Sequence, residues 1–99
     1  MFRHVAFLKF YPEVPEPERE KAIAMLAALK TLPEVREWSV GRQIRPKSEY
    51  DLVEVTTFDS REAFERFRVL PEHLAVVEVV RNIADWTVVD YEFQHQQGG

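Results

Sequence analysis

Apolar residues occupy both alternating sets of positions in the first segment of the chain, residues 2–11. Val5 and Phe7 share one parity, and the other parity carries Ala6, Leu8 and Phe10. A strand with one face in water alternates apolar and polar residues, whereas a strand that is covered on both faces does not. We therefore expect a strand with two covered faces, one under helices and the other against a second sheet or subunit.

An amphipathic helix is predicted over residues 18–30. Three prolines, at positions 12, 15 and 17, end the first strand and favour the first turn of a helix. Apolar side chains then recur at the i, i+3, i+4, i+7 spacing, at Ala22, Met25, Leu26 and Leu29. This spacing is typical of a helix that lies with one face on a sheet.

Two more strands, a helical region and a final strand account for the rest of the chain. Residues 35–44 and 50–58 read as strands, and the short polar turn between them predicts a hairpin. Asp59 and Glu62 have the spacing of a capping box with Asp59 as the N-cap. The helix that follows turns Phe64 and Phe67 inward, and Pro71 begins a second helical stretch. Residues 85–94 form the last strand.

The order β-α-β-β-α-β is the split βαβ arrangement of α+β proteins. Right-handed crossovers place both helical regions on one face of a four-stranded antiparallel sheet. The opposite face is not polar, so we expect two copies of the sheet to pack back to back as a homodimer. Residues 1–94 form this single domain, and residues 95–99 are expected to be a flexible tail.

Composition narrows the class of protein. The chain has 99 residues, enough for one domain, and 45% are hydrophobic and 12% aromatic, a surplus that a second subunit can cover. The absence of cysteine excludes disulfides and thiolate metal sites. A formal charge of −4 argues against nucleic acid as a partner. No apolar run approaches the roughly 20 residues of a membrane helix, so a soluble cytoplasmic protein is expected.

Two histidines are the candidates for chemistry. His4 shares strand parity with Ala6 and Leu8, and His73 is in helical register with the valines at 76, 77 and 80. Both imidazoles should therefore point inward, one from the sheet and one from the helical layer, and meet across a pocket. An imidazole exchanges protons near neutral pH. The candidate ligand-contacting residues around them are Tyr50, Phe67 and Leu70.

Several segments resemble the stress-responsive A/B barrel domain family, called Dabb. They are residues 4–10 (HVAFLKF), 40–42 (VGR) and 85–91 (DWTVVDY). Residues 70–73 (LPEH) are similar to the family's His-Pro-x-His segment, with leucine at its first position. The resemblance spans residues 2–93. It implies a ferredoxin-like fold and a homodimer whose sheets form a barrel, and most members have no established reaction.

One branch of that family contains polyketide cyclases, which perform an intramolecular aldol condensation without metal or organic cofactor. In that branch the resemblance implicates the histidines that match His4 and His73, together with a tyrosine that matches Phe67. Phenylalanine lacks the hydroxyl group that could orient a substrate oxygen. The cyclase set is therefore incomplete in this chain.

Four hypotheses for the histidines stay open at this point. In the first, both histidines are hydrogen-bonded core residues. In the second, they line an interior pocket for a small apolar or aromatic ligand, with a role in a stress response. In the third, His73 is the base and His4 its partner in a cyclase-like enzyme. In the fourth, one of them is an axial ligand in a haem-handling or oxygen-using enzyme. No His-x-x-x-His spacing is present, and we expect neither a metal nor a cofactor.

Overall fold

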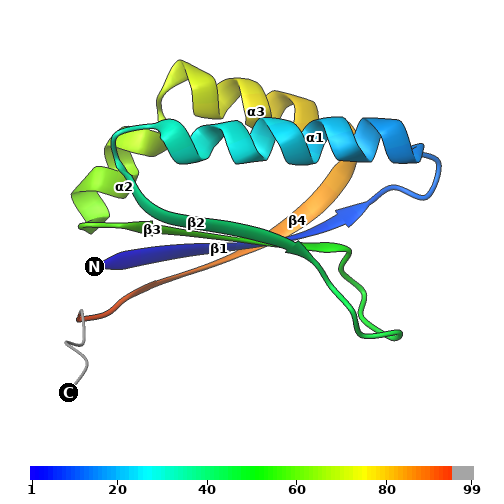
Figure 1. Cartoon of the computed structure of the whole chain (residues 1–99), viewed down its shortest axis with the longest axis horizontal. Helices are drawn as coiled ribbons and strands as arrows, with labels where there is room; N and C mark the ends of the chain where they lie inside the picture. Colours follow the sequence, from blue (N-terminus) through cyan, green and yellow to red (C-terminus); the bar gives the residue numbers. More distant parts are fainter. Residues whose placement is uncertain (95–99) are drawn as a thin grey trace.

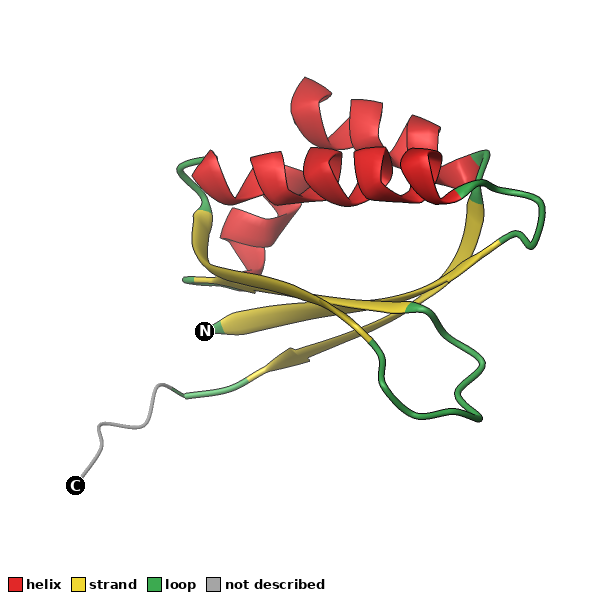
Figure 2. Cartoon of the chain, turned by 45° about the vertical axis from the view of Figure 1, so that its right-hand side comes forward, coloured by secondary structure: helices red, strands yellow, loops and turns green. Residues whose placement is uncertain are grey.

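A four-stranded antiparallel sheet carries the helices on one face (Figures 1 and 2). The computed structural model describes residues 1–94, so the tail expected at residues 95–99 lies outside the described residues. The elements in chain order are β1 (Phe2–Phe10), α1 (Glu16–Ala28), the 3-10 turn η1 (Leu29–Thr31), β2 (Val35–Arg42), β3 (Leu52–Phe58), α2 (Arg61–Arg68), α3 (Pro71–Arg81) and β4 (Ala84–Glu92). This order confirms the predicted βαββαβ arrangement and the ferredoxin-like α+β fold.

Strand β1 lies in the middle of the sheet, whose strand order is β2-β3-β1-β4. It pairs antiparallel with β3 on one side and with β4 on the other. The set of side chains that includes Phe2, Ala6, Leu8 and Phe10 is buried under the helices. His4 belongs to this same set, as its parity predicts, and it stands opposite Thr56 on β3 and Asp90 on β4.

Helix α1 begins two residues earlier than expected, directly after Pro15, and has Pro17 in its first turn. Proline fits there because the first amide groups of a helix have no partner within the helix. Ala22 and Leu26 are buried on the sheet side, and Leu29 continues the buried stripe into the 3-10 turn. The apolar period therefore predicted the packed face of the helix correctly.

The cap of helix α2 differs from the prediction by one residue. Ser60, not Asp59, is the N-cap, and its side-chain oxygen accepts a hydrogen bond from the amide of Ala63 at 3.1 Å. Serine and aspartate are both good N-caps, so sequence alone distinguishes them poorly. Asp59 instead forms an ion pair with Arg36 of β2, at 2.7 Å from the guanidinium Nε.

The sheet face opposite the helices is apolar and uncovered in the single chain. It carries Val5 and Phe7 from β1, Val53 and Val55 from β3, and Val89 and Tyr91 from β4. Val89 is 50% exposed and Tyr91 is 43% exposed. A contiguous apolar face of this kind is normally covered by another layer of protein. The described residues supply no second layer on this side of the sheet.

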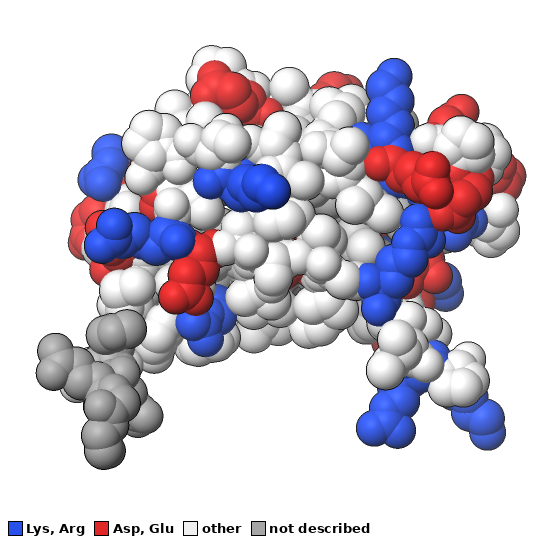
Figure 3. All heavy atoms as spheres, viewed as in Figure 1, with Lys and Arg blue, Asp and Glu red and all other residues white. Residues whose placement is uncertain are grey.

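The charged residues leave much of one face of the molecule uncharged. Figure 3 shows basic and acidic side chains intermingled toward the two ends of one face, with uncharged atoms over its centre. None of the helices within residues 1–94 combines the length and the apolarity that crossing a bilayer requires.

We expect a charge on the uncovered sheet face to disrupt self-association. Val53→Asp and Val89→Asp should each convert a dimer into monomer or aggregate, because the new carboxylate would lose its hydration at the interface. Size-exclusion chromatography with light scattering measures the mass. Leu74→Asp is the matched control, since Leu74 is 53% exposed on α3, away from this face. An unchanged dimer in both valine variants would contradict the interface.

Candidate functional site

A cavity of about 120 Å³ lies between the helices and the sheet. Most of its lining is apolar and comes from β1, α1, η1, α3 and β4. The lining residues are His4, Ala6, Leu8, Leu26, Leu29, Glu54, His73, Val76, Val77, Val80, Trp86 and Val88. Trp86 and Val88, on the edge strand β4, remain 40% and 39% exposed. The cavity therefore reaches the surface along the β4 edge.

His73 projects into this cavity from the first turns of α3. Its Nδ1 atom lies 3.0 Å from the carbonyl oxygen of Arg68. A carbonyl oxygen only accepts, so Nδ1 carries the proton and Nε2 of the neutral ring keeps its lone pair. The ring packs on Phe67 at a centroid distance of 4.8 Å. Burial lowers the pKa of His73, and the nearby charges of His4 and Arg68 lower it further, although the Arg68 carbonyl opposes this.

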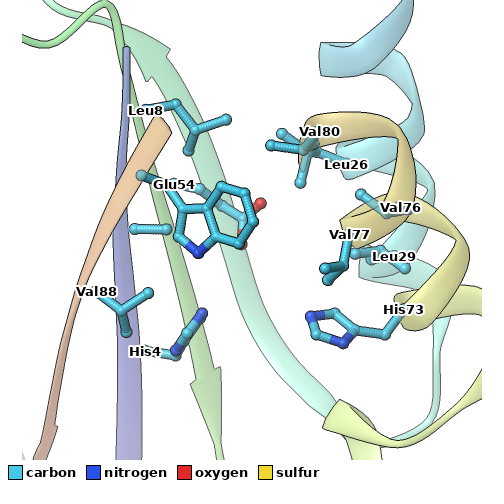
Figure 4. Close-up of a pocket in the computed structure, with 12 residues that line it drawn as sticks. His4, Leu8, Leu26, Leu29, Glu54, His73, Val76, Val77, Val80 and Val88 are labelled. Atoms are coloured by element: carbon cyan, nitrogen blue, oxygen red, sulfur yellow. The ribbon is translucent and has the colours of Figure 1, made fainter. Parts of the chain in front are cut away.

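His4 projects into the cavity from the sheet, and Figure 4 shows its ring toward that of His73. Its Nδ1 atom is 2.7 Å from a carboxylate oxygen of Asp90, its register partner on β4. The ring stacks on Phe64 at 5.0 Å, and the side chain is only 15% exposed. The carboxylate accepts a hydrogen bond from the Nδ1–H group and fixes the ring orientation. No hydrogen bond within residues 1–94 occupies Nε2 of either histidine.

Glu54 is the third titratable group of the cavity. The residue is 6% exposed, and its Oε1 atom accepts a hydrogen bond from the Thr56 hydroxyl at 3.2 Å. Its Oε2 atom is buried without a hydrogen-bond partner. Burial raises the pKa of Glu54 to about 7, and the bond from Thr56 opposes part of this rise. The carboxyl group is therefore largely protonated on the acidic side of neutrality.

The structure brings the two predicted histidines together but separates the other three candidates from the cavity. Phe67 is 3% exposed and lies behind His73, packed on Phe58 at 4.9 Å. Leu70 is the N-cap of α3 and does not line the cavity. Tyr50 packs with its ring 5.4 Å from Phe7 on the opposite face of the sheet.

Tyr50 lies on the opposite face because the chain bends before β3 begins. The Asp51 carboxylate accepts a hydrogen bond from the backbone amide of Phe10 at 2.8 Å. The backbone amide of Asp51 donates a hydrogen bond to the Leu8 carbonyl at 2.7 Å. Regular pairing starts only at Leu52. The alternation expected from residue 50 onward therefore fails at its first positions.

Sequence reasoning missed Asp90 and Glu54. Glu54 had a usable signal, because it alternates with Leu52, Thr56 and Phe58, so its charge falls at an inward position of a strand. Asp90 had no such signal, since its contact with His4 depends on the register between β1 and β4. Within residues 1–94, no group of three or more His, Asp or Glu side chains is arranged to hold a metal ion.

The family comparison settles the relationship that the sequence motifs indicate. The family model of the stress-responsive A/B barrel domain, Dabb, matches residues 2–93. The chain belongs to the Dabb family. A search of curated proteins gave no match.

Solved structures share the Dabb chain's fold at low sequence identity. A dimeric ferredoxin-like protein of unknown function from Thermobifida fusca is 22% identical, with a TM-score of 0.83 over 93% of this chain and 90% of that chain. The hydroxynitrile lyase from Passiflora edulis is 20% identical, with a TM-score of 0.87 over 98% and 96%. SnoaB, a cofactor-independent oxygenase from Streptomyces nogalater, is 14% identical, with a TM-score of 0.76 over 96% and 94%.

We expect Glu54→Gln to stabilise the protein at high pH. The native state holds the Glu54 proton more tightly than the unfolded chain does, so wild-type stability falls as the pH rises from the unfolded pKa through about 7. An amide does not ionise. The variant should gain about 1–3 kcal/mol in free energy of unfolding at about pH 8 and little at about pH 4, where the Glu54 carboxyl group of the wild type is largely protonated in both the native and the unfolded state.

Urea denaturation at the two pH values measures this difference. Glu20→Gln is the control, because Glu20 lies exposed on α1. A gain of equal size at both pH values, or in both variants, would contradict the assignment.

Proposed function

We propose that this Dabb protein is a homodimer that binds a small, mainly apolar or aromatic ligand in the cavity between α3 and the sheet. Its uncovered apolar sheet face supports the dimer, and so do structural neighbours that are described as dimeric. The cavity is the main observation that supports the ligand hypothesis. Apolar side chains line most of it, and the two imidazoles each present a free Nε2 atom.

The hydrogen bonding of the two histidines favours this function over a purely structural role. A core histidine normally has both ring nitrogens paired with protein or water. In His4 and His73 the protein pairs only Nδ1, through Asp90 and the Arg68 carbonyl. The size of the cavity is also suitable, since an engineered apolar cavity of about 150 Å³ in another protein binds benzene. We therefore expect this cavity of about 120 Å³ to accept a molecule of similar size.

A second candidate function is cofactor-independent acid–base catalysis of the aldol type. The neutral His73 has a lone pair on Nε2 and can remove a proton adjacent to a carbonyl group. His4, held by Asp90, can stabilise or relay the charge that develops. The fold is compatible with chemistry of this general kind, because neighbours of the same fold include a hydroxynitrile lyase and a cofactor-independent oxygenase. Phe67 lacks the hydroxyl group of the matching tyrosine in the cyclase branch. We therefore place ligand binding before catalysis.

We expect phenol to bind in the cavity and to depend on His73. The phenol hydroxyl donates to Nε2 of the neutral ring, and the aromatic ring contacts the valines of α3. Loss of one such hydrogen bond costs about 1 kcal/mol, so His73→Gln should weaken binding by roughly fivefold to tenfold. Chemical-shift titration of the labelled protein measures the affinity at about pH 7.5, where His73 is neutral.

Glu72→Gln is the matched control, because Glu72 is the exposed neighbour on the same helical turn. It should leave the affinity for phenol unchanged. Shifts that fail to map to the cavity, or an equal loss in both variants, would count against ligand binding at this site.

A further inference from the structure

Glu54, which lines the cavity that the proposed function assigns to the ligand, has a buried carboxyl oxygen without a partner. Glu54 is more than nine-tenths buried, and its Oε2 atom makes no hydrogen bond. An orphan buried polar atom costs free energy, commonly about 1–3 kcal/mol. Such an atom on a residue that lines a cavity needs an explanation, and a ligand in the cavity can supply the missing partner.

The surroundings of Glu54 favour the uncharged acid. Strand β2 places Val40 opposite it, and α1 and η1 contribute Leu26 and Leu29 to the same cavity. The titratable groups that share the cavity are His4 of β1 and His73 of α3. His4 is already paired with Asp90 of β4. Neither lysine nor arginine lines the cavity, so no fixed cation compensates an ionised Glu54.

The position of the proton follows from the hydrogen bond within β3. The Thr56 hydroxyl donates to Oε1, which therefore acts as the acceptor oxygen of the acid. Oε2 is left to carry the proton, and Oε2 is the atom without a partner. In this form Glu54 offers one O–H donor, in a cavity whose histidines offer ring nitrogens as acceptors when neutral.

We propose that protonated Glu54 is the hydrogen-bond donor that selects ligands with an uncharged carbonyl oxygen, such as small aromatic or aliphatic ketones. This inference rests on the proposed ligand site and names its substrate class. A ketone oxygen accepts a hydrogen bond from the Glu54 O–H group and satisfies the orphan atom, while the hydrocarbon part contacts Leu26, Leu29 and the valines of α3. A carboxylate ligand is disfavoured, because a second acidic group would lose its hydration in an apolar cavity without a cation.

A pair of ligands of similar shape tests the selection. Acetophenone carries a carbonyl oxygen, and isopropylbenzene replaces that oxygen by a methyl group. We expect acetophenone to bind about tenfold more tightly at about pH 5.5, where the acid is protonated. The preference should fall to about twofold or less at about pH 8.5, where Glu54 is ionised and no longer donates. Chemical-shift titration with each compound gives the two affinities.

Two variants separate the Glu54 carboxyl from other causes of pH dependence. Glu54→Gln keeps an N–H donor at every pH and should retain the preference for acetophenone at both pH values. Glu54→Leu removes the donor and should abolish the preference at both. The glutamine variant keeps the proposal testable even when the leucine variant does not fold, because a pH-independent preference is expected only from a permanent donor at residue 54.

The outcomes distinguish this inference from the proposed function. Binding of both compounds with equal affinity at about pH 5.5 would overturn the ketone selection and leave the apolar ligand site intact. A preference that persists at high pH in the wild-type protein would also overturn it. Absence of binding by acetophenone, isopropylbenzene and phenol alike would overturn both proposals.

Discussion

The position of β1 between β3 and β4 is the constraint on which the rest of the structure depends. Its antiparallel pairing on both sides fixes which of its side chains meet the helices and which meet the uncovered face. The same register places His4 opposite Asp90, so one pairing determines both the direction of the imidazole and its hydrogen-bond partner. A shift of one residue would exchange the two faces and remove His4 from the cavity.

The two faces of the sheet differ in what covers them. On the helix side, α1, α2 and α3 supply the apolar cover but leave a cavity that reaches the surface at the β4 edge. On the other side, valines of β1, β3 and β4 need a layer that the described residues do not provide. In the proposed function, association and ligand access therefore use opposite faces of the sheet, and a partner on the uncovered face would leave the cavity between sheet and helices unobstructed.

Residue periodicity predicted the elements and the inward direction of His4 and His73, because both depend only on positions within one strand or one helix. It did not predict the contact of His4 with Asp90, which requires the register between β1 and β4. Periodicity also did not predict the position of Tyr50 on the opposite face of the sheet. Hydrogen bonds of Asp51 bend the chain there, so the regular alternation of β3 begins only after Tyr50. Glu54 is a different kind of omission, since its inward charge was visible in the alternation of β3.

The cavity combines two titratable groups whose pKa values shift in opposite directions, and each shift favours the uncharged form of its group. Burial lowers the pKa of His73, so its Nε2 lone pair persists to lower pH than in a free imidazole. Burial raises the pKa of Glu54 to about 7, so its proton persists to higher pH than in a free carboxyl group. An acceptor and a donor are thus both present in their neutral forms just below neutrality, in a wall that is otherwise apolar.

This pairing also bears on the missing hydroxyl at Phe67. In the proposed site, a donor to a ligand oxygen does not have to come from α2, because a protonated Glu54 would offer one from the sheet, opposite the helix that holds His73. Pairs of titratable groups with separated pKa values are the usual basis of acid–base assignment in an active site. The arrangement is therefore suited to hold a small carbonyl compound between a proton acceptor and a proton donor, and the fold provides both without a metal ligand set among residues 1–94.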